Sequence, residues 1–179
     1  MTTTPKQMHL ADLKRGTPGI TPQYGEGLAQ AASVCLEERG HPITVSMPSD
    51  GDYPDQFHVI RDATTDQMKR CWADVDFTTE QGAYGVATLL VDALTPLEVV
   101  ERARKGTGFD YWLAPKGSSQ PLFQGKSRLE VSGIRSGDET AIVARVKRKS
   151  KQIGPNPHHL PGFVVVVEFG APRSRVVKR

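Results

Sequence analysis

Two carboxylates in the C-terminal half of the chain are spaced so that they could hold one metal ion. Asp110 lies near the start of the apolar stretch FDYWLAP, and Glu130 lies inside SRLEVSGIR. If these stretches form a hairpin whose loop centres on residues 119–120, residue 110 pairs with residue 130, and the paired Cβ atoms lie about 4.5–5.5 Å apart. Like charges at that spacing destabilise a sheet unless a cation lies between them. The spacing therefore predicts a divalent metal site.

The ligand atoms favour a hard cation. Oxygen-only ligation by two carboxylates, with water in the remaining octahedral positions, suits Mg²⁺ or Mn²⁺. Ser132 lies two residues after Glu130 and so shares its face of the strand. Its hydroxyl can hydrogen-bond a water or a phosphate oxygen, but it carries no charge. A metal held here would lower the pKa of a bound water and neutralise charge that develops on a phosphate.

Two helices are predicted beside these strands. The first spans residues 78–94, because Thr78 can act as N-cap with Gln81 as its reciprocal partner, and an apolar stripe follows at helical spacing. The second opens at Ser136, where Glu139 completes another capping box. Both helices therefore have an apolar side.

Strands fill the remainder of the C-terminal half. The residues enriched there are β-branched and apolar, which favours strand formation. The last of the predicted strands is a nearly continuous valine run, typical of a strand buried on both faces. The predicted strands are 97–104, 109–115, 127–135 and 162–170. The order of elements is therefore helix, three strands, helix, strand.

This order, with Asp on the second strand and Glu-x-x on the third, resembles the PD-(D/E)XK nuclease superfamily over residues 78–170. The resemblance implies an α/β fold of the α+β mixed-sheet type, with an αβββαβ restriction endonuclease-like core. It implies Asp110 and Glu130 as ligands of one or two Mg²⁺ or Mn²⁺ ions, and Glu80, in the first turn of the first helix, as a further metal ligand. The strings GTGFDYWL and LEVSGI also resemble small uncharacterised bacterial proteins, which add no named activity.

The chain departs from that family at one position. A Lys two residues after the Glu positions or activates the attacking water in the family, and Ser132 stands there in this sequence. A serine cannot supply the positive charge. Lys105, just before the second strand, and Lys126, at the start of the third, are the candidates to supply it from a shifted position.

Charge divides unevenly along the chain. The first hundred residues hold 7 Lys+Arg against 14 Asp+Glu, a net −7, whereas residues 101–179 hold 16 against 6, a net +10. Clustered Lys and Arg are what phosphate contacts require, so the basic half favours a DNA-binding surface, although a solvated face has the same composition. The cations expected to hold the DNA backbone lie on the second helix and are Arg145, Lys147, Arg148, Lys149 and Lys151.

Three segments are predicted from the pattern of elements. Residues 1–24 are expected to be a flexible arm that docks through Leu10 and Leu13, residues 25–75 an N-terminal α/β extension, and residues 76–179 the nuclease-like core. The extension is acidic. It is therefore the expected site for a protein partner or for a homodimer.

Several classes of protein are disfavoured by composition. No apolar run approaches 18 residues, so no membrane span is expected, and the N-terminus lacks the apolar region of a secretory signal. Two cysteines, Cys35 and Cys71, are too few for a disulfide scaffold or a zinc site. A cytoplasmic location fits best.

Two functions from different classes remain open. The first is a Mg²⁺-dependent enzyme that hydrolyses DNA phosphodiester bonds. The second is a catalytically inactive nuclease-like module that binds nucleic acid or protein within a bacterial defence or DNA-processing complex, and Ser132 is its main support. Structural explanations also exist for each acid: turn capping for Asp110, a salt bridge to Arg102 or Arg104 for Glu130, and interaction with the helix dipole for Glu80.

Overall fold

The structure is a computed structural model that describes residues 4–118, 126–154 and 159–179. Its helices are η1 (Leu10–Arg15), α1 (Pro22–Glu38), α2 (Asp66–Cys71), α3 (Val75–Leu94) and α4 (Glu139–Ile153). Its strands are β1 (Lys6–His9), β2 (Thr44–Gly51), β3 (Asp55–Ile60), β4 (Leu97–Arg102), β5 (Tyr111–Pro115), β6 (Ser127–Ile134), β7 (Gly162–Glu168) and β8 (Arg173–Lys178). They form one mixed sheet in the order β1-β3-β2-β8-β7-β6-β5-β4. The predicted mixed α/β fold is confirmed.

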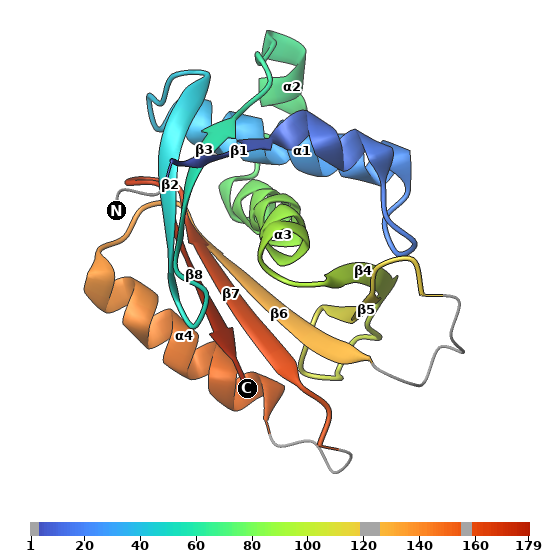
Figure 1. Cartoon of the computed structure of the whole chain (residues 1–179). Helices are drawn as coiled ribbons and strands as arrows, with labels where there is room; N and C mark the ends of the chain where they lie inside the picture. The colour runs from blue at the N-terminus through green and yellow to red at the C-terminus, as the bar shows by residue number, and fades with distance from the viewer. Residues whose placement is uncertain (1–3, 119–125, 155–158) are drawn as a thin grey trace.

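The helices lie on both sides of this sheet. Helices α1 and α3 cover one face, and α4 covers the other (Figure 1). Alternate residues of β7 enter the two cores: Val165 and Val167 pack with α1 and α3, while Val164 and Val166 pack with α4. This double burial explains the continuous valine run, because neither face of β7 meets solvent.

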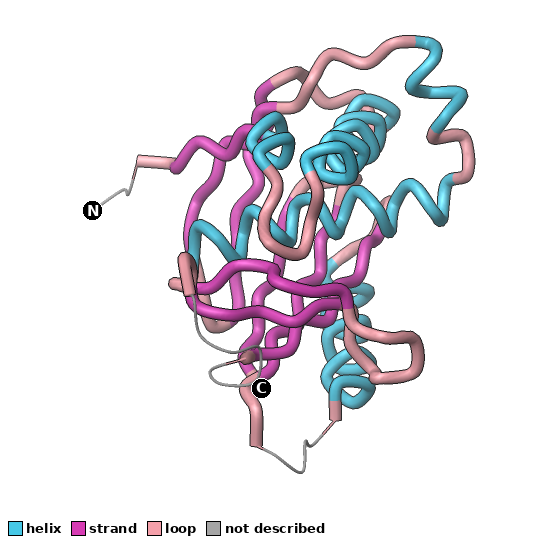
Figure 2. Tube along the Cα trace, turned by 90° about the vertical axis from the view of Figure 1, so that its right-hand side faces the viewer, coloured by secondary structure: helices cyan, strands magenta, loops and turns pink. Residues whose placement is uncertain are grey.

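The C-terminal half has the predicted order of elements. Strands β4, β5 and β6 are antiparallel neighbours, and β7 returns through α4 to pair parallel with β6. Tyr111 of β5 lies opposite Leu129 of β6, so the predicted register is confirmed. One residue further along, this register brings Asp110 opposite Glu130. The loop predicted to centre on residues 119–120 lies outside the described residues. In Figure 2, β4 and β5 run across the direction of the other strands.

Helix α3 packs closely against β6 because of one glycine. A Cβ atom built on Gly133 would lie 2.5 Å from the carbonyl oxygen of Thr79 and 3.1 Å from the Cβ of Ala83. No side chain fits in that space. Gly133 therefore lets the N-terminal half of α3 lie against the C-terminal end of β6, which extends past the first residue of the antiparallel strand β5.

Both predicted helix starts were wrong by a few residues. The N-cap of α3 is Asp74, whose Oδ1 accepts from the backbone N–H of Phe77 at 2.8 Å, and Thr78 lies inside the helix and donates to the carbonyl of Trp72. The N-cap of α4 is Asp138 rather than Ser136. Asp74 precedes the predicted Thr78 box and Asp138 lies within the predicted Ser136–Glu139 box, and in each case the aspartate caps the helix by accepting from an orphan N–H group.

The N-terminal segments belong to the same sheet. Within the predicted arm, residues 6–15 form β1 and η1, and the predicted docking of Leu10 and Leu13 is confirmed by their burial. Strand β2 of the predicted extension pairs in parallel with β8, which joins the two halves. No helix among the described residues has the length and hydropathy needed to cross a membrane.

Candidate functional site

Asp110 lies where β5 separates from β6. Its backbone N–H donates to the carbonyl of Leu129, and its carboxylate Oδ2 accepts from the backbone N–H of Val131, both at 2.8 Å. Strand β5 begins only at Tyr111, so it offers no backbone carbonyl to the N–H of Val131 on β6. The side chain of Asp110 accepts that hydrogen bond in place of a strand carbonyl. The carboxylate of Asp110 thus satisfies an amide of the neighbouring strand β6 and not an amide of its own turn, and it also lies beside Glu130.

The second carboxylate oxygen of Asp110 faces a tyrosine on α3. The hydroxyl of Tyr84 lies 2.9 Å from Asp110 Oδ1 and 3.1 Å from Oε1 of Glu80. Burial, followed by the charge of Asp110, raises the pKa of Tyr84, which keeps the hydroxyl protonated as a donor. Glu80 is exposed and lies in the second turn of α3, so its predicted place in the first turn was wrong.

Tyr84 is in turn held by an arginine between two aromatic rings. The guanidinium carbon of Arg102 lies 4.7 Å from the ring centroids of both Tyr84 and Tyr111. Its nitrogens donate to the two hydroxyls, at 3.3 Å to Tyr84 and 2.8 Å to Tyr111. Arg102 therefore belongs to a partly buried network behind Asp110 and does not pair with Glu130.

Glu130 is buried and pairs with a lysine of α4. Only 1% of Glu130 is exposed, and its Oε1 lies 2.5 Å from the Nζ of Lys149. Its Oε2 has no hydrogen-bond partner among the described residues. Burial raises the pKa of Glu130 to about 7, and the charge of Asp110 adds to the rise while Lys149 opposes it. The predicted salt bridge to Arg102 or Arg104 was wrong about the partner.

Ser132, which stands where the family has its lysine, is hydrogen-bonded by an arginine of α4. Arg145 Nη1 donates to Ser132 Oγ at 2.6 Å and to the carbonyl of Gly133 at 3.0 Å. Arg145 and Lys149 are one helical turn apart, so α4 presents both cations to consecutive same-face residues of β6. The positive charge that Ser132 lacks is therefore present nearby, on a different element.

A cleft of about 720 Å³ opens between α3 and α4 above the end of β6. One wall belongs to α3 and carries Asp76, Phe77, Thr79 and Glu80; the opposite wall belongs to α4 and carries Arg145, Arg148 and Lys149. Ser132 and Gly133 lie between the walls. Glu130 and Asp110 do not line the cleft, and the ammonium group of Lys149 lies between the cleft and Glu130.

The five predicted DNA-binding cations do not share one surface. Arg145, Arg148 and Lys149 line the cleft, whereas Lys147 and Lys151 line a groove on the other side of α4. The predicted cations are therefore divided between two surfaces of α4. The helical period decides this outcome, because 145, 148 and 149 point one way and 147 and 151 another.

The two lysines proposed as shifted replacements lie elsewhere. Lys126 pairs with Glu101 at 3.3 Å and lies 5.1 Å from the ring centroid of Trp112. Lys105 is exposed in the loop after β4 and does not line the cleft. The structure places Lys149 beside Glu130 instead. The sequence analysis assigned Lys149 only to contacts with the DNA backbone.

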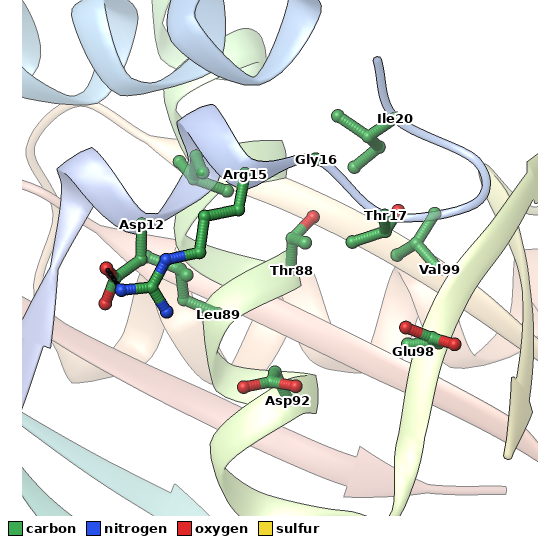
Figure 3. Close-up of a pocket in the computed structure, with 11 residues that line it drawn as sticks. Asp12, Arg15, Gly16, Thr17, Ile20, Thr88, Leu89, Asp92, Glu98 and Val99 are labelled. Carbon is green, nitrogen blue, oxygen red and sulfur yellow. Dashed lines mark ion pairs between the residues drawn. The ribbon is translucent and has the colours of Figure 1, made fainter. Parts of the chain in front are cut away.

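A smaller cavity of about 210 Å³ lies between η1, α3 and β4 (Figure 3). Its acids are already engaged: Asp12 pairs with Arg15, Asp92 pairs with Lys116, and Glu98 accepts from the backbone N–H of Gly117. None of the predicted site residues lines it. The cleft between α3 and α4 is therefore the better candidate site.

In the part of the chain that the structure describes, no group of three or more His, Cys, Asp or Glu residues is arranged to hold a metal ion. Comparison of the chain with protein-family models, with curated proteins and with solved structures gave no match.

Proposed function

We propose that the protein is a metal-dependent nuclease that hydrolyses DNA phosphodiester bonds beside the cleft between α3 and α4, where Lys149 lies between the cleft and Glu130. The observation that carries the proposal is the meeting of three groups: Asp110 and Glu130 on neighbouring strands, and Lys149 with its Nζ 2.5 Å from Glu130. The αβββαβ order from α3 to β7 supports a restriction endonuclease-like core as part of the same proposal.

The residues present suit a hard divalent cation. Glu130 Oε2 is buried without a partner among the described residues, which is costly unless a proton or a cation is bound there. Asp110 and Glu130 would hold Mg²⁺ or Mn²⁺, whereas Glu80 is linked to Asp110 by the hydroxyl of Tyr84 and would act outside the ligand set. When bound, such an ion supplies an activated water and neutralises phosphate charge.

Lys149 takes the role that Ser132 cannot fill. Its ammonium group lines the cleft and contacts Glu130, so it can donate to a phosphate oxygen that enters from above. Arg145, bound to Ser132, and Arg148 place two further positive charges on the same wall. These cations would bind backbone phosphates without reading sequence.

Cleavage of single-stranded circular DNA, with plasmid DNA assayed in parallel, in the presence of Mg²⁺ or Mn²⁺ tests the proposal. Asp110→Asn and Glu130→Gln should reduce cleavage to background, and Lys149→Met should reduce it by roughly 10²-fold, because it removes a preorganised charge. Lys147→Met is the matched control, since Lys147 lies two residues away but lines the other side of α4. Equal activity in wild type and in both carboxylate variants contradicts the proposal.

A second function is favoured by the same ion pair. Lys149 already neutralises Glu130 and Arg145 already fills the space at Ser132, an arrangement that also suits an inactive module within a bacterial defence or DNA-processing complex. Such a module would retain DNA in a salt-sensitive way without turnover, with the acidic N-terminal segment facing a protein partner or a second copy. Gain of cleavage in Ser132→Lys, absent in wild type, would favour this second function.

A further inference from the structure

The corner between α2 and α3 presents an aromatic surface at the cleft. Phe77 is 52% exposed and lines the cleft, and its ring stacks on that of Trp72 with centroids 5.9 Å apart and planes 14° apart. An aromatic side chain left this exposed has a π-face available to a ligand. None of the chemistry proposed for Asp110, Glu130 or Lys149 uses Phe77.

This aromatic pair is fixed in place. The indole Nε1 of Trp72 donates to Gln30 of α1 at 3.2 Å, and the carbonyl of Trp72 accepts from the hydroxyl of Thr78 at 2.8 Å. Phe77 itself lies in the first turn of α3 and donates its backbone N–H to the N-cap Asp74. The ring is therefore held on a rigid element, which lowers the entropic cost of stacking a ligand on it.

The charges of the two walls orient a ligand across the cleft. The wall with Phe77 also carries Asp76 and Glu80, which repel phosphate, and the opposite wall carries Arg145, Arg148 and Lys149, which attract it. A nucleotide in the cleft would thus turn its phosphate to α4 and its base to Phe77. Every base has a π-face, so such stacking is tolerant of sequence.

The burial of Glu130 and the size of the cleft limit which form of nucleic acid can reach the site. Glu130 is 1% exposed and lies behind Lys149, and the cleft holds about 720 Å³, within the range of about 300–1,000 Å³ typical of small-ligand sites. That space suits one or two nucleotides of one strand and excludes a duplex. A paired base also cannot turn its face to Phe77.

We propose, resting on the nuclease function above, that the cleft binds single-stranded DNA with an unpaired base stacked on Phe77. The substrate class is a single strand, a frayed end or a flap, and intact duplex is excluded. Trp72 supports the stacking ring from behind, and Arg145 and Arg148 hold the flanking phosphates.

Binding of a short single-stranded oligonucleotide containing 2-aminopurine, measured with EDTA present, tests this without relying on cleavage. Wild-type protein should bind the single strand more tightly than the hairpin duplex of the same sequence, and stacking should quench the fluorescence of 2-aminopurine. Phe77→Ala and Phe77→Leu should each weaken binding about fivefold or more and remove the quenching, whereas Phe77→Trp should keep both.

Val143→Ala is the matched control, because Val143 is 49% exposed on α4 but lines the groove outside the cleft. If Phe77→Leu keeps wild-type affinity while Phe77→Ala loses it, the corner is an apolar docking surface and the stacking proposal is overturned. Equal affinity of wild type for single strand and duplex also overturns it. Single-strand binding that is indifferent to Phe77 overturns this proposal alone, whereas a protein that binds no DNA removes the nuclease function as well.

Discussion

At the scale of single residues, the proximity of Asp110 and Glu130 could be predicted from residue numbers along a hairpin, but the contact of Lys149 with Glu130 could not. Asp110 and Glu130 belong to neighbouring strands, so their adjacency depends only on a register that the sequence limits. Lys149 reaches Glu130 from a helix 19 residues later in the chain, and that contact depends on how α4 packs on β6. The available signal was Arg145 and Lys149, which flank the buried stripe of Ile142 and Val146 at the same helical spacing.

The raised pKa of Glu130 predicts how stability depends on pH. Between the ordinary carboxyl pKa of 4.5 and about 7, the folded protein keeps the proton of Glu130 while the unfolded chain has lost it. The free energy of unfolding should therefore fall as pH rises through this window and level off above it, by a contribution on the order of 3 kcal/mol. Urea denaturation at pH 5, 6, 7 and 8, without metal, measures this slope.

Glu130→Gln provides the comparison for that titration. A neutral amide of similar shape keeps no proton equilibrium, so the variant should lose this slope and be more stable than wild type at pH 8. A parallel pH dependence in wild type and variant would assign the slope to other groups. Addition of Mg²⁺ should recover stability of wild type at pH 8 if the ion binds the native carboxylates.

At the scale of elements, the strands were predicted best where burial is on both faces. The valine run of β7 has one interpretation, whereas β8 was not predicted as a strand. In β8 the buried Ser174 and Val176 alternate with arginines whose charges are neutralised by Asp50 and Glu139, and that neutralisation depends on tertiary packing. Helix starts were missed because two candidate caps lie within a few residues, and local pattern alone does not choose between them.

The close packing of α3 on β6 predicts the effect of a small substitution. Gly133→Ala places a Cβ atom 2.5 Å from the carbonyl oxygen of Thr79, so α3 must shift and the protein should lose about 1–3 kcal/mol of stability. Gly27→Ala is the control, because Gly27 lies inside α1 and its added Cβ would lie 3.7 Å from the ring of Trp72, an ordinary contact distance. This substitution should stabilise the protein by about 0.5–1 kcal/mol. Thermal denaturation compares the two, and equal melting temperatures would argue against the α3–β6 contact.

At the scale of the whole molecule, the two halves share a sheet and a charge network. Strand β2 pairs with β8, and Arg175 of β8 pairs with both Asp50 of β2 and Glu139 of α4. The acidic N-terminal and basic C-terminal halves therefore neutralise each other in part where they meet. The sequence analysis divided the chain at residue 76 because the predicted order of elements begins there, while the pairing of distant strands is not visible in the sequence.

A continuous sheet predicts a single unfolding transition. Trp72 lies between α2 and α3 and Trp112 lies on β5, so variants that keep only one tryptophan report on different regions. Their fluorescence transitions in urea should coincide with each other and with the loss of far-ultraviolet circular dichroism. Separate midpoints, with Trp72 responding first, would show that residues 25–75 unfold as an independent unit.

The contacts of the Tyr24 hydroxyl limit how far this chain can be shortened from its N-terminal side. It donates to Gln81 of α3 and lies 3.4 Å from the hydroxyl of Tyr111, so the first long helix buttresses the tyrosine pair that steadies Asp110. Residues 76–179 hold every acid and base of the proposed chemistry. Without α1, however, that piece would lose the contacts of Tyr24 with Gln81 and Tyr111 that support the position of Asp110, and a shorter version of this chain would need other contacts in their place.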